Sequence, residues 1–187
     1  ILVRGRNVFM GYLNMPDKTQ ETFDAEGWLR TGDVGMVDED GFFRITDRMK
    51  DIIITAGGKN ITPSEIENEL KFSPYITDAV VVGDKRPYLT CLIMIDHENV
   101  ENYAQERSVP FSDFASLCRT QEVQALIQSE IDRVNAKFAR VEQIKKFRLI
   151  EYKLTAEDEE LTPTMKLKRK LVNEKYKDLI DSMYSSG

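Results

Sequence analysis

The sequence predicts an α+β protein in two parts: a β-rich segment over residues 1–46 and a small mixed α/β domain over residues 47–187. The apolar runs 77–83 and 88–96 predict two consecutive strands. The second run is apolar on both faces, which is typical of a central strand. Residues 121–139 carry apolar side chains at helical spacing, which predicts a long amphipathic helix.

Composition and charge narrow the class of protein. Hydrophobic residues make up 41% and charged residues 31% of the 187 residues, as in a globular protein. A formal net charge of −6 argues against broad nucleic-acid binding, although a local basic patch could hold a phosphate-bearing small molecule.

The location is predicted to be cytoplasmic. Cys91 and Cys118 lie in apolar or mixed segments, which fits reduced thiols better than a disulfide framework, although a single bridge stays open. No run approaches the ~18 apolar residues of a membrane span, and the N-terminus lacks a signal-peptide pattern. The chain begins without Met, in a strand-like Ile-Leu-Val, so we expect a fragment of a longer protein.

The first part is expected to contain little helix. Residues 18–23 predict one or two helical turns, and a β-hairpin is expected from 28–37 and 42–46 around the polar turn 38–41.

Asp33 stands at the entrance of this hairpin between Gly32 and Gly35, which leave room for a ligand near the backbone. A carboxylate there could accept both protons of a vicinal diol such as that of ribose. A simple turn explains the same residues, and from these residues alone it is the favoured interpretation.

Residues 47–61 mark the change from one part to the other. A charged tetrad, Asp47 to Lys50, precedes a β-branched run that stops at Gly57-Gly58. The strongest helix start follows: Thr62 is the candidate N-cap, Pro63 is the first helical residue, and Glu65 could complete a capping box. This helix is expected to run through Phe72.

The remaining elements are helices over 98–107 and 112–118, a strand over 145–152 and a closing helix after residues 161–170. His97, between Asp96 and Glu98, is read as a surface residue starting a helix rather than a metal ligand, because adjacent residues seldom converge on one ion. No metal site is predicted.

Three cations, Lys168, Arg169 and Lys170, surround the first turn of the closing helix and oppose the positive end of its dipole. This weakly indicates an anionic ligand. A solvated basic face balanced by the acidic residues 157–160 explains them as well, and it is the favoured interpretation.

Taken together, these pieces resemble the C-terminal part of an AMP-forming acyl-CoA synthetase, of the adenylate-forming superfamily. Residues 11–33, ending Gly-Trp-Leu-Arg-Thr-Gly-Asp, resemble the segment whose Asp binds the ribose hydroxyls of ATP. Residues 47–50, Asp-Arg-Met-Lys, resemble the interdomain hinge, and 53–59 the loop after it. Residues 161–169, Leu-Thr-Pro-Thr-Met-Lys-Leu-Lys-Arg, resemble the long-chain fatty-acyl form of the catalytic-lysine motif.

The resemblance implies roles in a first reaction step. Lys166 is the implied catalytic lysine, which stabilises charge as the fatty acid carboxylate attacks the α-phosphate of ATP. Asp33 is implied to bind the ribose, and Arg48 the ribose and phosphate region. The chain departs from much of the superfamily at Met165, where a Gly is common, and at Ile54, where many relatives have Lys or Arg.

A second step is implied in which the mobile lid, residues 47–187, rotates about Lys50 and brings Gly57 and Gly58 to the pantetheine of CoA. The cofactors implied are ATP, CoA as co-substrate and Mg²⁺ with ligands outside this chain. The implied partners are a fatty acid and the N-terminal domain of the same protein, with no nucleic acid; peripheral membrane association of the full-length enzyme is left open.

We therefore expect a long-chain fatty acid–CoA ligase, with the fragment inactive by itself. The alternatives are a ligase for another carboxylic acid or for a carrier protein, and, from another class, a non-catalytic nucleotide- or CoA-binding module.

Overall fold

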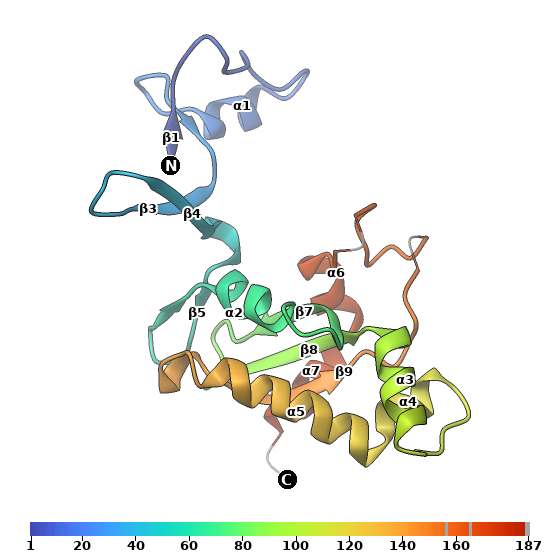
Figure 1. Ribbon diagram of the computed structural model, residues 1–187. Coiled ribbons are helices and arrows are strands. Elements are labelled where there is room, and N and C mark those ends of the chain that lie inside the picture. Colours follow the sequence, from blue (N-terminus) through green and yellow to red (C-terminus); the bar gives the residue numbers. More distant parts are fainter. Residues whose placement is uncertain (156, 165, 186–187) are drawn as a thin grey trace. The chain divides into compact units, whose positions relative to one another are not determined.

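The computed structural model describes residues 1–155, 157–164 and 166–185 (Figure 1). It divides into two compact units, Ile1–Ile52 and Ile53–Gly187. The boundary expected from the sequence, between residues 46 and 47, falls inside the first unit and stays a prediction.

The first unit holds short elements. Strands β1 (Leu2–Val3) and β2 (Leu29–Arg30) form one antiparallel pair, and β3 (Asp33–Val37) and β4 (Phe43–Arg48) form another. Helix α1 (Pro16–Thr22) lies between the strands of the first pair in sequence, and a 3₁₀ turn, Met49–Asp51, ends the unit.

No residue of this first unit, all of which the structure describes, is fully buried. Phe42, Phe43 and Ile45 are 71%, 76% and 66% exposed. The unit therefore has no hydrophobic core of its own, and its apolar side chains need another surface to leave water.

The predicted β-hairpin is confirmed, but its second strand is longer than expected. Register pairs Asp33 with Arg48 and Val34 with Asp47, so β4 continues two residues beyond Thr46. The register shifts between Val34 and Gly35, where an added Cβ would lie 2.7 Å from the Arg44 carbonyl oxygen. Because only Gly permits this approach, the bulge requires Gly at position 35.

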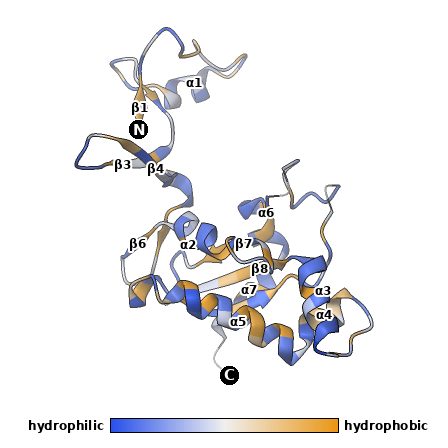
Figure 2. Cartoon of the chain, in the orientation of Figure 1, coloured by the Kyte–Doolittle hydropathy of each residue, from blue (hydrophilic) through white to orange (hydrophobic). Residues whose placement is uncertain are grey.

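The second unit is built on a three-stranded sheet in the order β7-β8-β9. Strands β7 (Ile76–Val82) and β8 (Leu89–Ile95) are antiparallel, whereas β8 and β9 (Ile144–Leu149) are parallel. Every residue of β8 is buried, which confirms it as the central strand. Figure 2 shows the apolar character of β7 and β8.

Helices cover both faces of this sheet because β8 is apolar on both. Leu89, Cys91 and Ile93 belong to one core cluster, and Leu92 and Met94 to another. The first core is filled by α2 (Pro63–Leu70), α3 (His97–Glu106), α4 (Phe114–Arg119) and α5 (Gln121–Asn135), the second by α6 (Arg169–Lys175) and α7 (Lys177–Tyr184). Strands β5 (Ile53–Ile54) and β6 (Asn60–Ile61) form a separate hairpin.

Several expectations for the helices are wrong in detail, and α2 ends at Leu70 rather than at Phe72. Helix α2 begins at Pro63 with Thr62 as N-cap, but Thr62 makes no side-chain cap bond, so the capping box with Glu65 is not formed. Pro63 already fixes φ and lacks the N–H that would need a partner, so the helix starts without the box. The closing helix is two helices, because Tyr176 departs from helical geometry at φ −101° and ψ 22°.

Within the described residues, none of the helices combines the length and the apolar content that crossing a membrane requires.

Candidate functional site

The first unit brings Asp33 and Arg48 together. Because β3 begins where β4 ends, these residues face each other in register, and Arg48 Nε lies 3.5 Å from Asp33 Oδ1. The side chains are 29% and 65% exposed, so both remain open to a ligand. A half-buried carboxylate beside a guanidinium can accept from a diol while the guanidinium binds phosphate.

Gly32 shapes the backbone beside this pair. Its φ of +77° is the left-handed conformation that favours Gly. Its carbonyl accepts from the Met49 N–H at 2.7 Å, which closes the hairpin at the point where the 3₁₀ turn begins. Lys50 lies in that turn, exposed, three residues before Ile53, where the second unit begins.

Gly57 and Gly58 form the tip of the β5–β6 hairpin. The Gly58 N–H donates to the Thr55 carbonyl at 2.8 Å, and Gly58 has φ +76°. A Cβ added at Gly58 would meet no atom within 4 Å, so this turn presents bare backbone to its surroundings. A ligand could approach the main chain closely here.

The hairpin is held to the turn between β7 and β8 by backbone bonds. The Lys85 N–H donates to the Ile54 carbonyl at 2.8 Å, and the Ala56 N–H donates to the Arg86 carbonyl at 3.0 Å. The Ile54 N–H donates to the Asp84 carboxylate at 3.2 Å. Ile54 thus contributes its backbone to this contact, and its half-exposed side chain adds no charge.

Lys166 lies in a closed loop before α6. The Lys166 N–H donates to Thr162 Oγ1 at 3.1 Å, its carbonyl accepts from the Thr162 N–H at 2.8 Å, and Leu161 forms a β-bridge with Leu167. Its side chain is exposed, and its ammonium makes no hydrogen bond or ion pair within the described part of the chain. Met165, the unusual residue before it, lies outside the described residues.

The cations that follow Lys166 have partners. Arg169 pairs with Glu67 of α2, with Nη2 2.6 Å from Oε1, and Lys168 donates to the Glu159 carbonyl at 3.0 Å. Lys170 lies 3.9 Å from Glu174. An anionic ligand is not required to balance Arg169, and the solvated basic face is wrong for this residue too, because its partner comes from α2.

Besides Glu160, which is 3% exposed and pairs with Lys175, two more buried carboxylates near the loop were missed from the sequence. Glu67 is 7% and Asp78 5% exposed. Burial raises the pKa of Glu67 above its ordinary value, and the Arg169 guanidinium opposes this effect. The sequence held a signal for each. Asp78 is a charged residue inside the apolar run of β7, and Glu67 is a carboxylate that adjoins the buried face of α2.

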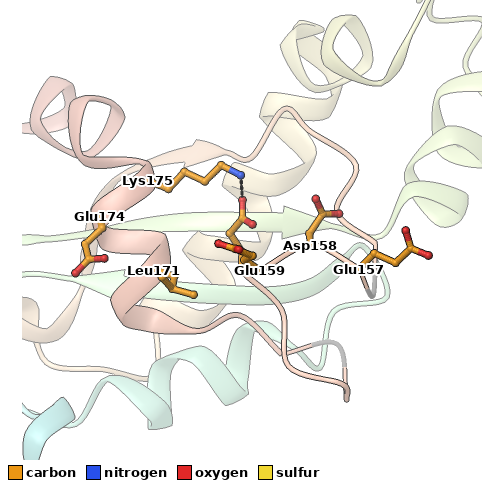
Figure 3. Close-up of a pocket in the computed structure, with 7 residues that line it drawn as sticks. Glu157, Asp158, Glu159, Leu171, Glu174 and Lys175 are labelled. Atoms are coloured by element: carbon orange, nitrogen blue, oxygen red, sulfur yellow. Dashed lines mark hydrogen bonds and ion pairs between the residues drawn. The ribbon is translucent and has the colours of Figure 1, made fainter.

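An acidic cavity of about 600 Å³ lies beside α6 (Figure 3). Residues 157–160 line it with Leu171, Glu174 and Lys175, and Lys175 is paired with Glu160. The hydrogen bond from Lys175 to Glu160 raises the pKa of Lys175, which stays cationic. The remaining carboxylates disfavour a phosphate there. Over the described ranges, no group of three or more His, Cys, Asp or Glu residues could hold a metal ion.

The two loops of the second unit lie on different sides of it. In Figure 1 the hairpin tip after β5 and the loop leading into α6 point away from each other.

Comparison with known proteins gives a consistent family. The profile of the AMP-binding enzyme C-terminal domain matches residues 50–187. The chain is 43% identical over 186 residues to the long-chain-fatty-acid–CoA ligase FadD15 of Mycobacterium tuberculosis, covering 99% of the chain and 31% of the relative. It thus spans about a third of that protein's length.

Solved structures agree on the fold. The adenylation domain of a carboxylate reductase from Mycobacterium chelonae superposes with a TM-score of 0.80 at 25% identity, covering 99% of this chain and 27% of that one. ATP-bound MatB from Rhodopseudomonas palustris gives a TM-score of 0.61 at 27% identity, covering 95% and 30%.

Proposed function

Because the chain belongs to the AMP-binding enzyme C-terminal domain family, we propose that it is the C-terminal part of a long-chain fatty acid–CoA ligase. The observation that carries this proposal is the 43% identity to FadD15 over 99% of the chain. A carrier-protein-loading enzyme is less well supported, since identity to the carboxylate reductase adenylation domain is 25%.

In the first half-reaction, a carboxylate oxygen of the fatty acid attacks the α-phosphate of ATP, and pyrophosphate leaves. Negative charge gathers at the α-phosphate in the transition state, and the Lys166 ammonium stabilises it there. The exposed, unpaired state of this ammonium among the described residues supports the role. Asp33 accepts from the ribose hydroxyls and Arg48 binds phosphate, which fixes the nucleotide for attack.

In the second half-reaction, the CoA thiol attacks the acyl carbon and AMP leaves. Gly57 and Gly58 then lie against the pantetheine arm, which is supported by the bare backbone of their turn. We propose Lys50 as the pivot that exchanges the two arrangements; its exposed position three residues before the second unit supports this.

Further partners follow from the same proposal. The first unit, without a buried residue of its own, packs on the N-terminal domain of the full-length protein. ATP is used with Mg²⁺, whose ligands we place in that domain.

A cytoplasmic location is supported by the two free, buried thiols of Cys91 and Cys118. Peripheral membrane association of the full-length enzyme is compatible with a long-chain substrate.

The experiment is pyrophosphate exchange with the full-length protein, followed by mass spectrometry of the CoA thioester. Long-chain fatty acids should support exchange and yield acyl-CoA, whereas acetate and aromatic acids should do so poorly. Exchange with aromatic or short acids alone would contradict a long-chain fatty acid as the substrate. No exchange with any carboxylic acid would contradict the proposed ligase activity.

A further inference from the structure

The loop that carries Lys166 has hydrogen bonds of its own, and other elements hold it to the rest of the domain. The Thr162 bonds and the Leu161–Leu167 bridge close the loop. None of these bonds reaches the sheet. The position of Lys166 relative to the domain therefore depends on the packing of Leu161 and Leu167 on the second core and on polar contacts made by residues outside the loop.

Asp78 provides one such link. Asp78 Oδ2 accepts from the Leu167 N–H at 2.7 Å, directly after Lys166. Its other oxygen accepts from the Ala79 N–H at 3.0 Å and lies 3.4 Å from the Lys71 ammonium. Both carboxylate oxygens are thus occupied, in a residue only 5% exposed.

A bulge in β7 aims Asp78 at the loop. The register shifts between Ile76 and Asp78, so Ile76 joins the core under α2 and α5 while Val80, on the same face as Asp78, joins the core under α6 and α7. Leu167 packs against that second core. Without the bulge, Asp78 would point away from Leu167.

Glu67 provides the second link. Strand β7 lies at an edge of the sheet, so the backbone of Val81 has no neighbouring strand to bond on that side. The ion pair of Glu67 and Arg169 supplies those hydrogen bonds instead. Glu67 Oε1 accepts from the Val81 N–H at 2.8 Å, and Arg169 Nη1 donates to the Val81 carbonyl at 2.8 Å. Because Arg169 also binds Glu67, the start of α6 is fixed to β7 and α2 just after Lys166.

We propose that Glu67 and Asp78 are positioning residues for the adenylation half-reaction, because they hold the loop that presents Lys166. This inference rests on the proposed function, in which Lys166 is the catalytic lysine. Charged hydrogen bonds are roughly twice as strong as neutral ones, so neutral isosteres loosen the loop. Misplacement of a catalytic group by about 1 Å can cost roughly 100-fold in rate.

The variants are Glu67→Gln and Asp78→Asn in the full-length protein. Glu67→Gln keeps one oxygen for Val81 and Arg169, removes the charge and replaces the second oxygen by an NH2 group. Asp78→Asn leaves one acceptor oxygen for donors that now occupy two. The matched control is Glu69→Gln, also on α2, which removes a partner of the exposed Lys137 and touches nothing in the loop. Lys166→Ala is the benchmark.

Adenylation is measured as single-turnover pyrophosphate release, and thiolation as acyl-CoA formation from supplied acyl-adenylate. We expect both positioning variants to lose roughly 10- to 100-fold in the adenylation rate, with little change in the KM for ATP. The thiolation rate of both variants should stay within about twofold of that of the unmodified protein, because Lys166 acts only in the first step. The control Glu69→Gln should stay within about twofold in both half-reactions. In a Lys166→Ala background, Glu67→Gln should add less than about twofold.

Equal loss of both half-reactions in step with a lower Tm would show a role in folding alone and overturn the inference. So would unchanged adenylation in both variants while Lys166→Ala abolishes it. If Lys166→Ala itself leaves adenylation intact, the proposed function of Lys166 fails, and that outcome is distinct from the other two.

Discussion

Replacing each of the two glycines of the β5–β6 turn by Ala separates the effect of backbone strain on stability from the effect of an added methyl group on catalysis. Gly58 has φ +76°, and a Cβ there would meet nothing within 4 Å, so Gly58→Ala introduces strain without a clash. The left-handed conformation costs an L-residue about 1–2 kcal/mol. Gly57 has no such φ, and its Cβ would meet only Thr55 Oγ1 at 3.9 Å, an ordinary contact.

The two variants should therefore differ in stability and agree in catalysis. Gly57→Ala should gain about 0.4–1 kcal/mol by restricting the unfolded chain, while Gly58→Ala should lose about 1–2 kcal/mol. In the proposed thiolation arrangement both added methyl groups would obstruct the pantetheine arm, so both should slow thiolation, by about tenfold for each 1.4 kcal/mol added to the barrier.

The assay pairs urea unfolding with thiolation of supplied acyl-adenylate in the full-length protein. Adenylation by the same preparations serves as the control and should be unchanged. If Gly57→Ala is as stable as expected and forms acyl-CoA at the unmodified rate, no ligand approaches this turn closely and the role given to it is wrong.

Three further outcomes are expected. Lys50→Pro should block thiolation and spare adenylation, because a fixed φ obstructs the pivot; a rapid-quench assay of both steps checks this, and no effect on either would move the hinge elsewhere. Asp33→Asn should raise the KM for ATP about tenfold, since a neutral amide accepts diol protons less well; unchanged ATP kinetics would contradict ribose binding. Because burial raises the pKa of Cys118 to about 12 and that of Cys91 well above its ordinary value, neither thiol should react with iodoacetamide at pH 8 until the protein unfolds. Peptide mapping checks this, and rapid labelling of the native protein would contradict it.

Local patterns predicted the elements of the second unit well. The apolar run 88–96 predicted the central strand, because a strand covered on both faces needs apolar residues on both. Pro63 marked the start of α2 for a steric reason that needs no tertiary contact. Boundaries were less accurate, since β4 extends to Arg48 only because it pairs with Asp33.

The site was harder to predict because its supports are distant in sequence. Arg169 and Glu67 are 102 residues apart, and the local sequence around neither residue indicates that the two are in contact. Helix periodicity marks Ile66 and Leu70 as buried but does not show that the adjoining Glu67 is buried too. The bulge that turns Asp78 toward Leu167 is likewise a product of strand pairing, which the sequence of β7 alone does not show.

The most direct test of the account is the pair of half-reactions in Lys166→Ala. In the full-length protein, pyrophosphate release from ATP and a long-chain fatty acid should be abolished, because the charge that gathers at the α-phosphate loses its cation. Thioester formation from supplied acyl-adenylate and CoA should remain close to the unmodified rate, because Gly57 and Gly58 are intact. Equal loss of both half-reactions, or full retention of the first, would contradict the assignment of Lys166 to adenylation.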